Sequence, residues 1–355
     1  MRNAYIADVD DGLCMAVQTV GGEVILIDCG SAIGYWNQSG GRLAHDGLRR
    51  IIKKFSAPSN LVLSHFHLDH YSGFIFAASL PVYSRRPLFL VNQIYYPKVP
   101  AFSRSTEFLL ALLTMNFRLL GDETGVAEYD LVKLVTRLNG GVMPGFTPTC
   151  QGTKLNIGGS LYTVLWPPLA VAENSITAKA IVRAISLFDL AIREDEPTRR
   201  WYKYVQNTHL PDKYLEGERG DAKYHENKAL DFPKIEFRKL SLVVEQANWA
   251  IREAANRISL AICEENQGLL FFGDVMSREI KSITEDLLAC GKQKFGLLVT
   301  PHHGTRWNNT LLKIRSRYAA SSCGHRLYQF VRPEFKKIAK LHCATWISGD
   351  LLLQW

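Results

Sequence analysis

The sequence predicts an α/β layered protein with a mostly helical segment inside it, and three observations support this class. Short apolar runs of strand length alternate with amphipathic stretches of helix length, which is typical of sheets covered by helices. Of the 355 residues, 47% are hydrophobic and 21% are charged, an ordinary composition for a protein with a large core. Residues 169–255 stand apart, because they are helix-prone and rich in charges of both signs. We therefore expect one domain over residues 1–355 that carries 169–255 as a helical insertion or cap.

Apolar periodicity places the elements of the first half. The first two strands should turn at Gly21-Gly22, and apolar residues recur at helical spacing between Leu48 and Phe55. Strands are expected at residues 4–20, 22–28, 60–63 and 88–91, and helices at 43–55, 108–120 and 129–138.

In the second half, a hairpin is expected at residues 154–166, with its turn at Gly158-Gly159 and its end at Pro167-Pro168. After the charged segment the strand patterns return. Strands are expected at residues 258–262, 268–272 and 295–299.

Charge and cysteine usage bear on partners and compartment. The net charge is +8, and residues 313–340 hold eight basic residues against the single acid Glu334, so this stretch is either a face for a polyanion or an ordinary solvated surface. The seven cysteines are scattered without a CxxC pair, no apolar run has the length of a membrane span, and the start has no signal-peptide pattern. We expect a cytoplasmic protein with free thiols and no membrane partner.

A histidine-rich motif follows the strand expected at 60–63. It reads His65-Phe66-His67-Leu68-Asp69-His70, and alternate side chains of an extended chain point the same way. If the extended geometry persists, His65, His67 and Asp69 share one face and His70 turns in beside them. Imidazole and carboxylate together suit zinc, manganese or iron, and the lack of nearby cysteines argues against a structural zinc cluster. The motif predicts a metal site.

Three other apolar strands end in residues of the same kind. Asp28 ends the strand at 22–28, Asp274 follows the strand at 268–272, and His302-His303 follow the strand at 295–299. Because open sheets bind ligands at the carboxyl ends of their strands, these residues are expected to share one site with the motif. Asp28 either sits against the histidine loop and orients it or is a plain turn residue before Gly30.

These motifs resemble the metallo-β-lactamase superfamily, and within it the branch typified by the soluble domain of the competence protein ComEC. The resemblance covers residue 5 to the end except for 169–255. It rests on the histidine motif and on four further stretches, which are Ile25-Leu26-Ile27-Asp28-Cys29-Gly30, Asn256-Arg257-Ile258-Ser259-Leu260, Gly273-Asp274 and Pro301-His302-His303-Gly304-Thr305.

The resemblance implies a four-layer αββα metallo-β-lactamase sandwich and two divalent metal ions, zinc or manganese. His65 and His67 would hold the first ion, Asp69, His70 and one of His302 or His303 the second, and Asp274 would bridge them. We favour His303 as the ligand and His302 as a group that faces substrate, so that Asp69, His302 and Asp28 would serve the reaction. Many members of the superfamily supply a further histidine to the first ion from the segment between the histidine motif and the bridging aspartate, and this branch often lacks it. In this sequence, only His209 and His225 lie between His70 and Asp274.

Three functions are compatible with this sequence. The first is a metal-dependent hydrolase of phosphodiesters, such as a nuclease, in which a hydroxide bridging the two ions attacks phosphorus. Nucleic acid or another phosphodiester would then be the substrate. The second is a hydrolase of a lactam, lactone or thioester. The third is a non-catalytic subunit that uses the same fold and binds a protein partner through residues 169–255.

Overall fold

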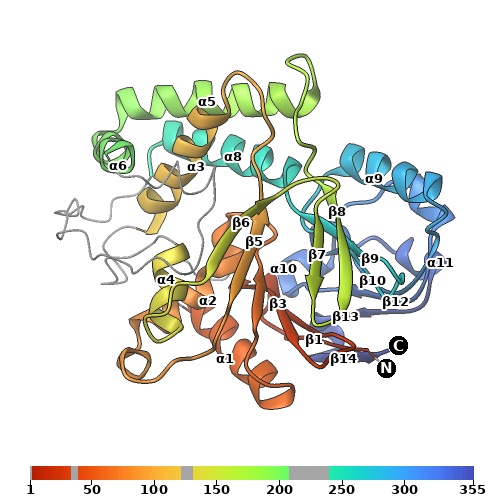
Figure 1. The fold of residues 1–355 in the computed structure, drawn as a ribbon. Helices are drawn as coiled ribbons and strands as arrows, with labels where there is room; N and C mark the ends of the chain where they lie inside the picture. The colour runs from red at the N-terminus through yellow and green to blue at the C-terminus, as the bar shows by residue number, and fades with distance from the viewer. Residues whose placement is uncertain (1, 33–38, 121–130, 208–239) are drawn as a thin grey trace.

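The structure is a computed structural model that describes residues 2–32, 39–120, 131–207 and 240–355. These residues form two seven-stranded sheets, which lie face to face (Figure 1). The first sheet has the order β14 (Leu351–Gln354), β1 (Asn3–Ile6), β2 (Gly12–Gln18), β3 (Val24–Ser31), β4 (Asn60–Val62), β5 (Gln93–Pro97) and β6 (Gly145–Thr149). The second has the order β13 (Ala339–Ala344), β12 (Arg315–Ser321), β11 (Lys294–Val299), β10 (Leu269–Phe271), β9 (Ala261–Glu264), β8 (Ser160–Trp166) and β7 (Lys154–Ile157).

Both sheets are mixed in the same way. Strands β3 to β6 are parallel in the first sheet, as are β10 to β13 in the second, and the remaining pairs are antiparallel. The first and last strands, β1 and β14, pair with each other, so the two termini lie side by side (Figure 1). The carboxyl ends of the parallel strands are therefore available on both sheets to build a site.

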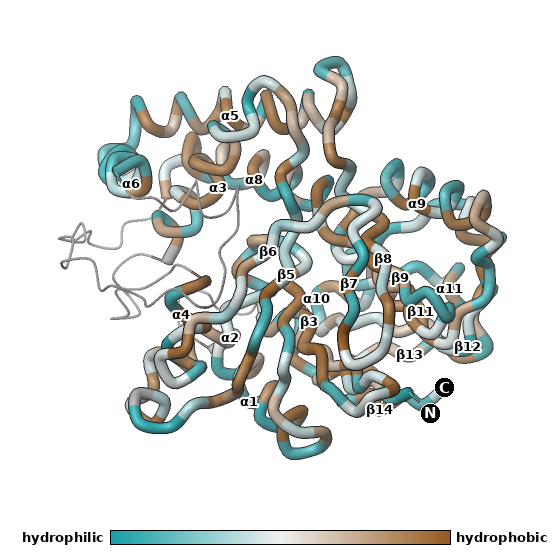
Figure 2. Tube along the Cα trace, viewed as in Figure 1, coloured by the Kyte–Doolittle hydropathy of each residue, from teal (hydrophilic) through white to brown (hydrophobic). Residues whose placement is uncertain are grey.

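Three apolar cores define four layers. One core lies between the first sheet and helices α1 (Ser39–Lys54), α2 (Leu68–Ser79), α3 (Ser105–Leu120), α4 (Leu131–Leu138), α5 (Ile176–Glu194), α6 (Glu196–Gln206) and α8 (Leu242–Arg257). The second joins the inner faces of the two sheets, and the third lies between the second sheet and α9 (Ser277–Ala289) and α11 (Phe335–Ile338). Figure 2 shows hydrophobic residues along these strands. The predicted α/β class and αββα layering are confirmed.

Short elements connect these layers. They are the 3₁₀ turns η2 (Pro81–Ser84), η4 (Pro301–Gly304) and η5 (Asn309–Lys313) and the one-turn helices α10 (His325–Tyr328) and α12 (Thr345–Ser348).

The described part of residues 169–255 contains α5, α6 and α8, which pack together over the first sheet (Figure 1). Each helix begins at a side chain that accepts a hydrogen bond from the first turn, namely Ser175, Asp195 and Ser241. Residues 208–239, with His209 and His225, lie outside the described residues. No helix among the described residues is long and apolar enough to cross a membrane.

Two expected strands are wrong in detail. Residues 4–20 do not form one strand, because 7–11 leave the sheet between β1 and β2, and Asp10 there has a φ of 61°. Residues 88–91 are not a strand either, since β5 begins at Gln93. The backbone of Val91 bonds instead to the side chain of Asn139, and Leu88 bonds to the end of α4. At residues 88 and 91, hydrogen bonds to the end of α4 and to the Asn139 side chain replace the sheet ladder that the apolar pattern predicted.

Candidate metal centre

The histidine motif spans a loop and the start of a helix. Strand β4 ends at Val62, His67 keeps an extended backbone, and α2 begins at Leu68, so Asp69 and His70 lie in its first turn. The expectation that the extended geometry continues to Asp69 is therefore wrong. The helix start still turns both side chains inward, and an acid in the first turn interacts favourably with the helix dipole. All four polar residues of the motif are buried.

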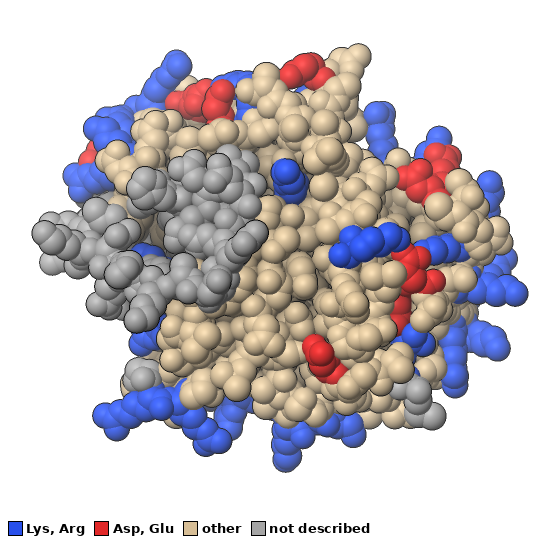
Figure 3. Space-filling view, viewed as in Figure 1, with Lys and Arg blue, Asp and Glu red and all other residues tan. Residues whose placement is uncertain are grey.

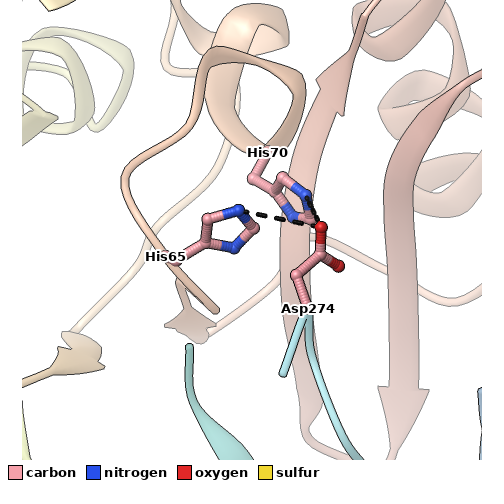
Figure 4. A group of neighbouring side chains, drawn as sticks. All are labelled: His65, His70 and Asp274. Atoms are coloured by element: carbon pink, nitrogen blue, oxygen red, sulfur yellow. Dashed lines mark ion pairs between the residues drawn. The ribbon is translucent and has the colours of Figure 1, made fainter. Parts of the chain in front are cut away.

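Asp274 joins this loop from the second sheet. It follows β10, and its Oδ2 lies 3.8 Å from His65 Nε2 and 3.6 Å from His70 Nε2 (Figure 4). The same oxygen lies 3.5 Å from His303 Nε2. Two groups of ligand-type atoms result, and within each group the atoms lie within 4.8 Å of one another. One group is His65, His70 and Asp274, and the other is Asp69, His70 and His303. Residues from both sheets thus converge on one point, as the strand ends predicted.

Four buried ligand atoms at this point have no hydrogen-bond partner: His67 Nε2, Asp69 Oδ1, His70 Nε2 and His303 Nε2. A buried polar atom without a partner costs free energy, and most such atoms in native proteins are satisfied. Imidazole nitrogens and carboxylate oxygens are the donors that zinc and manganese accept. The residues present therefore fit divalent metal ions.

Asp28 orients His70. Its carboxylate accepts hydrogen bonds from the Ser64 amide at 2.7 Å, from Ser64 Oγ at 2.6 Å and from His70 Nδ1 at 2.7 Å. In the neutral imidazole, a proton held on Nδ1 leaves the Nε2 lone pair of His70 facing Asp274. Asp28 lies inside β3 rather than at its end, and its φ is 56°, an uncommon conformation for a residue other than glycine. The hydrogen bonds hold it there.

The two histidines after β11 occupy different positions. Both have positive φ, 50° for His302 and 59° for His303. His303 is buried, its Nδ1 donates to the Ser322 carbonyl at 2.9 Å, and its Nε2 faces Asp274. His302 has a fifth of its side chain exposed, and its Nε2 lies 3.9 Å from Asp274 Oδ2, farther than that of His303. Both of its ring nitrogens already have hydrogen-bond partners, Nδ1 with Thr305 Oγ1 at 2.7 Å and Nε2 with Asn256 Nδ2 at 3.2 Å. His303 thus has the ligand geometry.

His67 is placed differently from the ligand set that the resemblance implies. Its Nδ1 lies 2.8 Å from His65 Nε2, and it belongs to neither group of converging ligand atoms. Its unpartnered Nε2 is nevertheless buried beside them.

Electrostatics tie these groups together. Burial opposes ionisation of Asp274, but His303, His302 and His70 outweigh it and hold the pKa of Asp274 well below its usual value. Burial likewise opposes protonation of His70, whereas Asp28 and Asp274 raise its pKa well above the usual value. The centre therefore favours ionised carboxylates.

Sequence reasoning missed Arg252 on α8. Its guanidinium lies 3.6 Å from Asp69 Oδ2. Burial opposes ionisation of Asp69, but the charges of Arg252, His70 and His67 together outweigh it and lower the pKa of Asp69 to about 2. Burial and the same guanidinium lower the pKa of His67 to about 3. The only signal in the sequence is that Arg252 precedes Asn256 by four residues, so both lie on one face of a helix.

The basic stretch at 313–340 lies mostly away from this centre. Lys313 and Arg315 lie at the amino end of β12, and Lys340 lies at the amino end of β13. Asp274 and His303, in contrast, follow the carboxyl ends of the neighbouring parallel strands β10 and β11. A strand as long as β12 separates the two ends by roughly 20 Å. Lys and Arg side chains gather at the edge near α11 and β12 in Figure 3. Most of this charge is therefore remote from the metal-type side chains.

Comparisons with known proteins find similarity among solved structures. No protein-family model matches the chain, and no curated protein matches it. Among solved structures it is similar to the metallo-beta-lactamase fold protein YhfI from Bacillus subtilis, with 10% sequence identity, a TM-score of 0.41, and coverage of 99% of this chain and 100% of that chain. At this identity the likeness concerns fold alone. The layered fold and the converging His and Asp side chains are compatible with a metal-dependent hydrolase.

Proposed function

We propose that the protein is a metal-dependent hydrolase of phosphodiesters that holds two divalent ions, zinc or manganese. The observation that carries this proposal is the set of four unpartnered buried ligand atoms around Asp274. His65 and His67 would hold one ion, Asp69, His70 and His303 the other, and Asp274 would lie between them. Ions at these positions would lower the pKa of bound water towards neutrality and stabilise negative charge on the attacked phosphoryl group.

The surrounding residues have distinct tasks. Asp28 keeps the proton of His70 on Nδ1, and the Ser322 carbonyl does the same for His303. The Thr305 hydroxyl donates to the His302 carbonyl, so His302 Nδ1 donates to Thr305 and its Nε2 accepts from Asn256. His302 is therefore a neutral, partly exposed imidazole, suited to contact substrate rather than metal.

Metal content per chain tests the proposal. We expect about two ions in the wild type after reconstitution with zinc or manganese, and their loss in His67→Ala/Asp69→Ala. The matched control, His325→Ala/Asp286→Ala, removes an exposed histidine and an exposed aspartate elsewhere and should keep both ions.

Hydrolysis of bis(p-nitrophenyl) phosphate should follow metal content across these variants. A wild type that takes up no zinc or manganese would refute the proposal. Hydrolysis of a chromogenic lactam without phosphodiester hydrolysis would replace the substrate class with the carbonyl alternative.

A further inference from the structure

One face of α8 leads into the metal centre. Trp249, Arg252 and Asn256 follow one another at spacings of three and four, so their side chains lie along one stripe of the helix. Asn256 Nδ2 lies 3.2 Å from His302 Nε2, and the Arg252 guanidinium lies 3.6 Å from Asp69 Oδ2. The stripe thus contacts the site at two points and continues outward for one more turn.

Exposure increases along this stripe. Arg252 has 35% of its side chain exposed, so its charge reaches both Asp69 and solvent. Trp249 is 71% exposed, although Ala250 and Ile251 beside it are buried. An exposed indole next to an arginine supplies a stacking surface and a phosphate-binding fork, which are the two elements of single-strand nucleic-acid recognition.

Two further exposed aromatic side chains lie in the chain that follows Ser322. His303 donates to the Ser322 carbonyl, and the chain continues from Ser322 into α10 and on to Phe330, which is 60% exposed. Trp346 in α12 is 45% exposed and contacts the His325 ring with a centroid distance of 5.3 Å. Exposed aromatic side chains on α8 and after Ser322 would offer stacking surfaces to a ligand longer than a small phosphodiester.

We propose that the stripe of Trp249, Arg252 and Asn256 is a binding track for single-stranded nucleic acid. Arg252 binds a backbone phosphate next to the metal centre, Trp249 stacks on the neighbouring base, and Asn256 fixes His302 beside the same phosphate. The inference rests on the proposed phosphodiesterase function and names its substrate class.

Binding can be measured apart from catalysis. Fluorescence anisotropy of a labelled single-stranded oligothymidine, in EDTA and over a series of salt concentrations, gives both affinity and the number of phosphate contacts. Arg252→Ala should weaken binding and reduce the slope of log K against log salt by about 0.7, the value for one phosphate contact. Arg252→Lys should keep that slope. Arg278→Ala on α9, an exposed arginine elsewhere, is the matched control and should change neither quantity.

The tryptophan gives an independent readout. Trp249→Ala should weaken binding about tenfold without changing the salt slope, because stacking involves no phosphate contact. Trp249→Phe should retain most of the affinity, which a loss of folding would not produce.

The outcomes separate this inference from the proposed function. Wild-type affinity and slope in both alanine variants would overturn the track. So would a wild type that hydrolyses the phosphodiester reporter but binds no oligonucleotide, and this result would leave the hydrolase in place. The predicted binding pattern in a chain that takes up no metal would support the track and refute the hydrolase.

Discussion

Replacement of Asp28 by asparagine should weaken metal binding although it removes no proposed metal ligand. In the wild type, Asp28 Oδ1 accepts from the Ser64 amide and Oδ2 accepts from His70 Nδ1. In the variant, the remaining oxygen can still accept from the Ser64 amide, but an NH₂ group takes the place of Oδ2. Two donors cannot face each other at 2.7 Å, so His70 must move its proton to Nε2. That proton occupies the lone pair directed towards Asp274.

The size of the effect follows from this single proton. Loss of a carboxylate that fixes a ligating histidine lowers metal affinity by about 10- to 100-fold, or about 1.4–2.8 kcal/mol. The fold itself should change less, because Ser64 Oγ can accept from the new amide group. Asp28→Asn should therefore bind its metal weakly but still reach the wild-type metal content at saturating concentrations.

Competition with a chromophoric chelator measures the affinity, and thermal unfolding in EDTA measures the stability of the metal-free chain. Asp286→Asn, a change of the same kind at an exposed position, should match the wild type in both assays. Wild-type metal affinity in Asp28→Asn would refute the role assigned to this carboxylate. A loss of folded protein in EDTA would show that Asp28 acts on stability instead.

Two further predictions concern packing and pH. Gly30→Ala would place a Cβ 2.3 Å from the Asp69 carbonyl carbon, so it should destabilise the fold by about 1–3 kcal/mol and lower metal content. Gly22→Ala introduces backbone strain at a φ of 86° but meets nothing within 4 Å, so it should leave metal content unchanged; equal metal content in both variants would contradict this. Burial opposes ionisation of Asp350, but hydrogen bonds led by Arg50 lower its pKa, so its contribution of about 1–2 kcal/mol should be present above pH ~4 and fade as pH falls further. Urea unfolding of Asp350→Asn should show a larger difference from wild type at pH 7 than at pH 3, and an equal difference at both would contradict the assignment.

The layers and the convergence of the site were predictable because both follow from patterns repeated along the chain. Apolar strands that end in Asp274 and His303 reach one point whenever their strands are parallel neighbours, and β10 and β11 are such neighbours. The turn of the motif into α2 was not predictable, since the preference of Asp69 for a helix start depends on the surrounding packing. The ion pair between Arg252 and Asp69 joins positions far apart in sequence, which no local pattern records.

The distribution of charge decides between two ways in which this protein could hold a polyanion. Residues 313–340 contain eight basic residues, and a single-stranded nucleic acid that contacts all of them would give a slope of log K against log salt of about 5 to 6. The structure separates most of them from the metal centre along the length of β12. Near the centre, Arg252 acts on Asp69 and Arg306 acts on His302. Two phosphate contacts give a slope of log K against log salt of only about 1.4. A single-stranded nucleic acid bound at the centre would therefore owe its affinity mainly to stacking and to contacts with the site itself.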